Sequence, residues 1–246
     1  MATQTAVQIG GIEVSSEKAQ SMTGMQSMAS KMWAPWLVMG FMIVMISLII
    51  GAIVANTASD YFSFSKEVRE AAVANTDIAD KKAFIEATKA WLPTFKFLGL
   101  GLIMGGITFA LATILGNLKT GGGRVQKAIG KGTMELKPPM TAKMFPMVMM
   151  MGMMVLMASF VIGIILAVIS ADYWNHSIAA ELNTASAGSG LLSDLGTIKA
   201  ISLWLAPLKF VGIAMILSSI VLALATIVRV LRFQTVRIVD LVNDQG

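Results

Sequence analysis

The stretch from Met147 to Ala171 constrains the fold most, because it contains no charged residue. A helix rises about 1.5 Å per residue, so this stretch is long enough to cross a hydrocarbon core of about 30 Å. Three more apolar stretches, at 33–59, 91–118 and 203–228, are of similar length. Hydrophobic residues make up 56% of the 246 residues and mean hydropathy is +0.74, far above what a soluble domain requires. The sequence predicts an all-α integral membrane protein with four transmembrane helices.

The segments between these spans differ in composition. Residues 1–30 are polar and lack the basic start and apolar core of a cleaved signal peptide, so we expect a retained tail, either without regular structure or as a short surface helix. Residues 65–91 are rich in Ala, Glu and Lys, with apolar residues at helical spacing, which predicts a helical outer loop between the first two spans. The expected organisation is an N-terminal tail at 1–30, a first hairpin at 31–118, a basic linker at 119–142, a second hairpin at 143–228 and a C-terminal tail at 229–246.

The distribution of lysine and arginine predicts the orientation. Eleven of them lie in the two tails and the central linker, whereas six lie in the two loops on the other side. The positive-inside rule then places both termini and the linker in the cytoplasm, and we expect the membrane to be that of a bacterial or archaeal cell. The eleven are Lys18, Lys31, Lys119, Arg124, Lys127, Lys131, Lys137, Lys143, Arg229, Arg232 and Arg237.

The net charge of +5 follows from this topology. Anionic lipid headgroups at the cytoplasmic face are the expected partner of the basic segments, beside the bilayer itself. Nucleic acid is not expected, because the glycine-rich linker has no aromatic side chains on which bases could stack.

An internal repeat is the most specific signal in the sequence. Adding 112 to several positions of the first span gives the same residue type in the third, and adding 113 does so for several positions of the second span and the fourth. Because the matches include Gly, Lys, Asp and Trp, they indicate a tandem duplication of a two-helix hairpin, with both copies in the same orientation. Matched pairs include Lys31 and Lys143, Gly40 and Gly152, Ser47 and Ser159, Gly51 and Gly163, Asp60 and Asp172, Tyr61 and Tyr173, Trp91 and Trp204, Lys96 and Lys209, Phe97 and Phe210, and Gly99 and Gly212.

Glycines within the spans predict close helix contacts, because they let two backbones approach. Gly101 and Gly105 form a GxxxG pair in the second span. A role in a pore or a ligand site is the alternative for these glycines. The predicted packing positions are Gly40, Gly51, Gly99, Gly101, Gly105, Gly152, Gly163 and Gly212.

The repeated charged residues suggest two ion pairs. Asp60 and Asp172 stand at the outer ends of the first and third spans, while Lys96 and Lys209 each follow a span-opening Trp by five residues. A lysine at that depth can extend toward the interface, where an Asp is a suitable partner. We expect Asp60 to pair with Lys96 and Asp172 with Lys209 as structural clamps, with ion or proton transfer as the alternative.

The count of 20 methionines raises the question of a metal. Thioethers are soft ligands suited to Cu(I), and residues four apart lie on one face of a helix. Adaptable packing is the preferred interpretation, with no metal or other cofactor expected. The candidates for Cu(I) are Met45, Met104, Met153, Met157 and Met215.

The chain offers little for catalysis. It has no Cys, a single His at position 176, and no carboxylate pair inside the spans. The sequence therefore favours a noncatalytic membrane subunit that supports or assembles a larger complex, with other integral membrane subunits or copies of itself as partners. The alternative is a small oligomeric transporter or channel, with Cu(I) handling as a variant.

Overall fold

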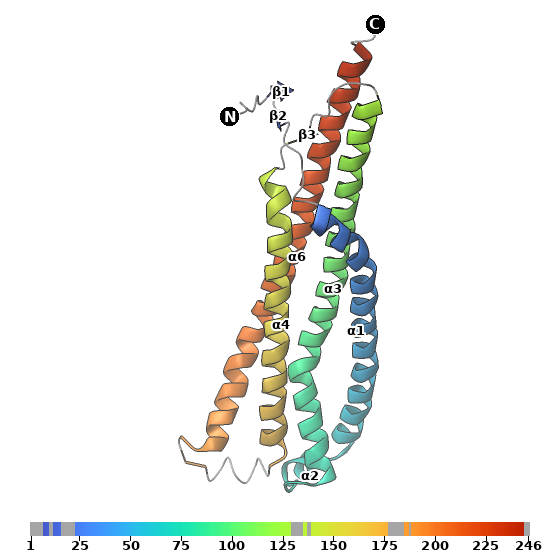
Figure 1. Ribbon diagram of the computed structural model, residues 1–246. Coiled ribbons are helices and arrows are strands. Elements are labelled where there is room, and N and C mark those ends of the chain that lie inside the picture. The colour runs from blue at the N-terminus through green and yellow to red at the C-terminus, as the bar shows by residue number, and fades with distance from the viewer. Residues whose placement is uncertain are drawn as a thin grey trace. The chain divides into compact units, whose positions relative to one another are not determined.

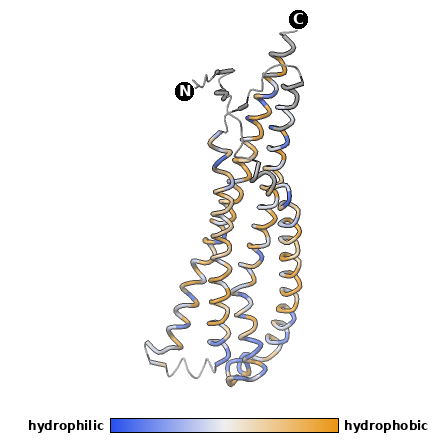
Figure 2. The backbone as a smooth tube through the Cα atoms, viewed as in Figure 1, coloured by the Kyte–Doolittle hydropathy of each residue, from blue (hydrophilic) through white to orange (hydrophobic). Residues whose placement is uncertain are grey.

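The computed structural model describes residues 7–9, 12–15, 23–128, 135–136, 139–176, 185–186 and 188–243. Four long helices dominate it (Figure 1): α1 at Thr23–Ser63, α3 at Asp77–Ala128, α4 at Met140–Trp174 and α6 at Gly190–Asn243. Each contains a segment long and apolar enough to cross a membrane, and Figure 2 shows hydrophobic residues along all four. The prediction of four membrane-crossing helices is confirmed.

The helices extend well beyond the apolar stretches. α3 begins at Asp77, more than three turns before Trp91, and continues to Ala128 inside the predicted linker. Asp77 and Asp80 lie in its first turn, where carboxylates interact favourably with the helix dipole. The span boundaries read from hydrophobicity therefore mark only the apolar parts of longer helices.

A short helix, α2 at Lys66–Glu70, lies between α1 and α3. It is capped by Ser65, whose Oγ accepts a hydrogen bond from the backbone N–H of Val68 at 3.3 Å. Asn75 follows with a φ of 59°, a left-handed conformation that Asn tolerates and that separates α2 from α3. The segment predicted to be helical at 65–91 is thus divided between α2 and the first turns of α3.

Three short strands form an antiparallel sheet: β1 at Val7–Ile9, β2 at Ile12–Ser15 and β3 at Glu135–Leu136. Val14 pairs with Val7 on one side and with Leu136 on the other. β-branched residues in β1 and β2 favour this conformation. Short strands thus occur in the expected N-terminal tail and in the expected linker.

The chain forms two compact units. Unit 1 comprises 1–37, 104–150 and 215–246, and unit 2 comprises 38–103 and 151–214. Each long helix contributes one segment to each unit. α3 is the most buried of the four, with 44% of its most apolar window buried, whereas α1 has 11%. α3 is therefore the helix most covered by the rest of the chain, and α1 leaves most of its apolar surface uncovered.

In unit 1 a hydrophobic core joins α3, α4 and α6. Polar side chains connect helices at two levels of this unit: Thr108 and Ser219 hydrogen-bond at 3.3 Å where both are buried, and the hydroxyl of Thr226 donates to that of Thr141 at 2.8 Å. Such contacts satisfy hydroxyl groups that lipid would leave unpaired. The core residues are Leu115, Phe145, Ala223, Ile227 and Val230.

Candidate functional site

Glycine contacts in unit 2 bring helices together backbone against backbone. A β-carbon on Gly40 of α1 would lie 2.6 Å from the carbonyl oxygen of Gly99 and 2.7 Å from the backbone nitrogen of Ile103, both on α3. A β-carbon on Gly212 of α6 would lie 2.8 Å from the side chain of Leu156 and 3.2 Å from the carbonyl oxygen of Gly152, both on α4. Glycine is required at Gly40, where a side chain would overlap the backbone of α3, whereas at Gly212 the nearest atoms belong to the flexible Leu156 side chain.

The other predicted glycines differ in their surroundings. A β-carbon on Gly163 would lie 2.6 Å from Oγ1 of Thr94, and one on Gly105, in unit 1, would lie 3.0 Å from the ring of Trp36. Gly101 is buried, whereas a β-carbon on Gly51 would meet nothing within 4 Å. Gly51 therefore does not mark a close approach.

One close contact was not predicted from the sequence. A β-carbon on Gly106, in unit 1, would lie 3.0 Å from the carbonyl oxygen of Trp33 and 3.1 Å from the backbone nitrogen of Leu37. The adjacent pair Gly105 and Gly106 was the available signal, but the GxxxG spacing drew attention to Gly101 instead.

These crossings set the depth of Lys96. α1 and α3 run antiparallel, and Gly40 lies between the levels of Gly99 and Ile103. Lys96 lies about five residues, or about 7.5 Å, before the level of Gly40 along α3. Five residues beyond Gly40 along the antiparallel α1 is Met45, so Lys96 and Met45 lie at the same level. Met45 is near the middle of the apolar stretch 33–59. Lys96 thus lies deep in the span as measured against α1, although it is only five residues from Trp91 on its own helix.

Lys209 lies at the equivalent depth in the second hairpin. It precedes Gly212 by three residues, and the contacts of Gly212 with Gly152 and Leu156 put Lys209 level with Met157, near the middle of the stretch 147–171. The sequence placed both lysines nearer the interface, because depth was counted from the Trp at the start of each span.

The predicted ion pairs do not form. Asp60 lies 20 residues beyond Gly40, or about 30 Å along α1, whereas Lys96 lies only three residues from Gly99. The first turns of α3, and not Lys96, lie beside the end of α1. For example, the ammonium of Lys82 lies 5.7 Å from the ring centroid of Tyr61.

Asp172 and Lys209 are also far apart. Asp172 lies 16 residues, or about 24 Å, beyond Leu156 along α4, whereas Lys209 lies three residues from Gly212, which contacts Leu156. Within the described residues the ion pairs are Lys66 with Glu70, Lys81 with Asp77, and Lys82 and Lys89 with Glu86.

The two deep lysines have different environments. Lys209 is buried, with 9% of its surface exposed, and its ammonium lies 5.5 Å from the ring centroid of Phe97. Phe97 in turn packs edge to face on Phe210, with ring centroids 5.3 Å apart. Lys96, beside Phe97 on α3, is exposed on the surface of the chain. Neither lysine forms an ion pair with a carboxylate of the described residues.

Further matched residues of the two hairpins make the same local contacts. Ser47 and Ser159 are both completely buried, and each hydroxyl donates to the carbonyl oxygen four residues earlier at 2.8 Å. Tyr61 and Tyr173 are both buried, and each packs edge to face on the next residue, at 5.1 Å on Phe62 and 5.0 Å on Trp174.

The candidate Cu(I) ligands are not enclosed. Met45 and Met157 are exposed, while Met104, Met153 and Met215 are half-buried. His176 is exposed, and its Nδ1 lies 2.7 Å from the carbonyl oxygen of Asp172, to which a protonated Nδ1 donates. No group of three or more His, Asp or Glu side chains suited to a metal occurs in the part of the chain that the structure describes.

Comparison with protein families, curated proteins and solved structures finds no match for this chain. Its assignment as a membrane protein rests on its own structure, in which four helices are long and apolar enough to cross a membrane. Glycines lie where helices cross, and two lysines lie deep in the spans.

Proposed function

We propose that this protein is a noncatalytic membrane subunit that supports or assembles a larger membrane protein complex, and that Lys96 lies on the surface that contacts a partner. The observation that carries the proposal is an exposed lysine deep in a transmembrane helix without a carboxylate partner in the described residues. A lysine at the centre of such a helix costs about 2.5–3.5 kcal/mol on insertion scales. A partner helix that supplies a carboxylate or another acceptor at this depth would offset that cost.

The exposure of α1 is consistent with this proposal. Only 11% of its most apolar window is buried within the chain, so its surface is available to lipid or to neighbouring subunits. Association of helices in lipid depends on close packing and polar contacts, and α3 offers a polar contact at Lys96.

We also propose that the bundle arose by tandem duplication of a hairpin. The support is the equivalence of the two glycine crossings, Gly40 with Gly99 and Gly152 with Gly212, at positions related by the sequence repeat. The matched contacts of Ser47 and Ser159 add to it. Two hairpins in the same orientation would be related by an axis along the membrane normal.

For orientation, we propose that both termini and the basic linker are cytoplasmic in a bacterial or archaeal cell membrane, where anionic headgroups would contact the basic segments. The support is the excess of lysine and arginine in these segments. With this orientation, α2 and the first turns of α3 are on the outer side.

A photoreactive side chain at Leu100 tests the proposed partner contact. Leu100 is exposed and lies one turn from Lys96 on the same face of α3. Irradiation of native membranes is expected to give an adduct of defined mass with another membrane protein, and Lys96→Glu should abolish it. A probe at the exposed Val168 of α4 is the control, and its products should not respond to Lys96→Glu. Adducts with lipid alone at Leu100 would contradict the proposal.

Lys209 supports the alternative of a small transporter or channel. A buried ionisable residue within a membrane helix commonly belongs to an ion or proton pathway. Vesicles that contain only the purified chain should then conduct ions or protons, and Lys209→Met should reduce the flux at least tenfold. No flux above that of empty vesicles would remove this alternative, and copper analysis of the same preparation tests the Cu(I) variant.

A further inference from the structure

Basic and aromatic residues surround a cavity of about 400 Å³ in unit 2. Its walls come from the end of α1, from α2, from the first turns of α3 and from the end of α4. We call it the basic pocket. Its charged and aromatic lining residues are Tyr61, Lys66, Arg69, Glu70, Lys82, Trp174 and His176.

The segments around the basic pocket are held together by specific contacts. The side-chain oxygen of Asn175, just after α4, accepts a hydrogen bond from the backbone N–H of Asn75 at 3.3 Å, and its Nδ2 donates to Oδ1 of Asn75 at 3.2 Å. Asn75 has the left-handed backbone that directs the chain from α2 into α3. Two residues 100 positions apart thus fix the end of α4 beside the start of α3.

Two cations of the pocket lie against aromatic rings. The guanidinium of Arg69 lies 5.3 Å from the ring centroid of Tyr61 and 4.9 Å from that of Phe62. The ammonium of Lys82 lies 4.5 Å from the ring of Trp174 and 5.7 Å from that of Tyr61. Cation–π contacts hold each group in place without neutralising its charge.

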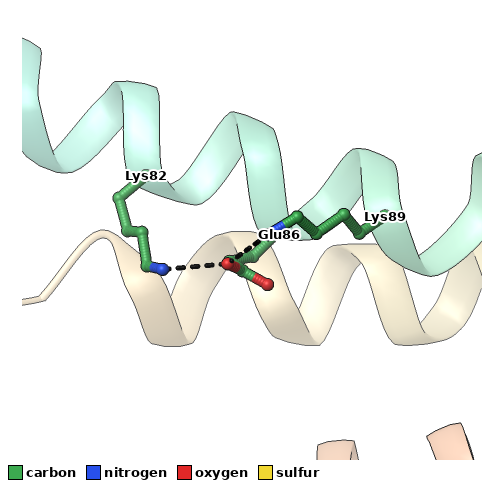
Figure 3. Close-up of polar contacts among 3 residues, drawn as sticks. All are labelled: Lys82, Glu86 and Lys89. Atoms are coloured by element: carbon green, nitrogen blue, oxygen red, sulfur yellow. Dashed lines mark hydrogen bonds and ion pairs between the residues drawn. The ribbon is translucent and has the colours of Figure 1, made fainter. Parts of the chain in front are cut away.

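Two nearby carboxylates, Glu86 and Glu70, already pair with lysines. Glu86 accepts hydrogen bonds from Lys82 at 2.8 Å and from Lys89 at 3.0 Å, so one carboxylate faces two ammonium groups (Figure 3). Lys66 and Glu70 are 3.6 Å apart and largely exposed, which makes a weak pair.

Arg69 differs from the lysines of α2 and of the first turns of α3. Its Nε donates to the carbonyl oxygen of Phe64 at 3.2 Å, but it has no ion pair with any carboxylate of the described residues. A guanidinium carries five N–H donors, so four remain for a ligand.

We infer that the basic pocket binds a phosphate-type oxyanion, carried by an anionic lipid headgroup or by a small phosphate ester, with Arg69 as the principal ligand. The planar guanidinium matches two oxygens of a phosphate at once, which an ammonium does not. Lys66 and Lys82 line the same cavity, although each is paired with a carboxylate, Glu70 or Glu86. Glu70 is the one carboxylate among the described lining residues. Tyr61 and Trp174 are of the kind that favours the headgroup level of a membrane.

This inference does not depend on a partner subunit, because all the residues involved belong to unit 2 of one chain. A bound oxyanion would also explain why Arg69 occurs on the proposed outer side, where the positive-inside rule expects few basic residues. Lys66, Lys81, Lys82 and Lys89 each form an ion pair with a carboxylate of the described residues, whereas Arg69 does not, although Glu67 and Glu70 lie in the same short helix.

Native mass spectrometry of the full chain in neutral detergent tests the site, with phosphatidylglycerol and phosphatidylcholine titrated separately. The chain is expected to bind phosphatidylglycerol at least fivefold more tightly. Arg69→Gln should reduce this preference to less than twofold, and Arg69→Lys should give an intermediate value because it keeps the charge but not the fork. Lys199→Gln is the control, since Lys199 is an exposed lysine of α6 outside the pocket.

Glycerol phosphate separates the two sources of the oxyanion. If it displaces phosphatidylglycerol from the wild-type chain, the pocket accepts a free phosphate ester; if it does not while the preference still depends on Arg69, the ligand is a lipid headgroup. The inference is overturned if the chain shows no preference for phosphatidylglycerol and no binding of glycerol phosphate, or if Arg69→Gln and Lys199→Gln have equal effects.

Folding of Arg69→Gln is checked by its helical circular dichroism. If the variant loses its helices, Lys66→Gln replaces it, because the Lys66 side chain is 77% exposed and its loss leaves the helices intact. Lys66→Gln should then lower the preference at least twofold, and an unchanged preference overturns the inference.

Discussion

A β-carbon on Gly40 would lie 2.6 Å from the carbonyl oxygen of Gly99, so α1 and α3 touch there with backbone against backbone. The corresponding glycines of α4 and α6, Gly152 and Gly212, also lie close, with 3.2 Å between the carbonyl oxygen of Gly152 and a β-carbon on Gly212, although the side chain of Leu156 is nearer at 2.8 Å. These crossings fix the level of each helix against its neighbour, and therefore the depth of Lys96 and Lys209.

Gly40→Ala is expected to destabilise the protein by about 1–3 kcal/mol, because the new methyl group would overlap the backbone of α3. Gly51→Ala is the matched control on the same helix. It has open space, and alanine is the better helix former, so it should be neutral or slightly stabilising. Unfolding of purified protein in detergent, followed by circular dichroism, measures both. Equal losses for the two variants would contradict the crossing.

Asp60 and Lys96 should show no energetic coupling, because they are displaced by more than 20 Å along their helices. The exchange Asp60→Lys with Lys96→Asp should therefore not restore what either single change loses. A double-mutant cycle of unfolding free energies measures the coupling. A value above about 0.5 kcal/mol would indicate that the two residues meet after all.

Thr108 and Ser219 should be coupled, because their hydroxyls hydrogen-bond at 3.3 Å in a buried contact between α3 and α6. Measured contacts of this kind in membrane proteins average about 0.6 kcal/mol, with a maximum of about 1.7. The cycle Thr108→Ala with Ser219→Ala is expected to give a value in this range. Thr113→Ala, which removes a hydroxyl bonded only to Phe109 of its own helix in the described contacts, should not couple to Ser219→Ala.

Hydrophobic patterning predicts the four spans because a charge-free stretch of about 20 residues has few other uses. The repeat also indicated which glycines would correspond, since Gly40 and Gly99 recur as Gly152 and Gly212. Both features are local or periodic, so they can be recognised in a single sequence.

The depth of Lys96 could not be predicted in the same way. It depends on how far α3 is shifted along α1, and this shift is set by the contacts of Gly40 rather than by the position of Trp91. The predicted pair with Asp60 failed for this reason. Helix was predicted over 65–91, but its continuity with the second span as a single helix from Asp77 was not, because these polar turns were assigned to a separate loop.

The basic pocket could not be predicted from the sequence for a related reason. Tyr61, Arg69 and Trp174 come from three separate elements, and no spacing in the sequence brings them together. The unbalanced charge of Arg69 becomes visible only once Glu70 and Glu86 are seen to pair with lysines.

Lys96→Leu measures what an exposed lysine deep in a span costs on membrane insertion. On the isolated chain, the substitution should favour membrane insertion by about 2.5–3.5 kcal/mol, because the charge is removed from a position exposed on the surface. An insertion assay of α3 with and without the change measures this. The same assay of α6 with Lys199→Leu, at an exposed position far from the span centre, should give a smaller effect.

The size of the native complex tests the central claim most directly. Membranes extracted in mild detergent and separated by blue native electrophoresis should show the wild-type chain in a complex larger than its own mass of 26.2 kDa plus detergent. Lys96→Glu should shift it to the size of the free chain, while Lys199→Glu should leave the complex unchanged. A wild-type chain that migrates alone, or a complex that survives Lys96→Glu, would contradict the proposal that Lys96 lies on the surface that contacts a partner.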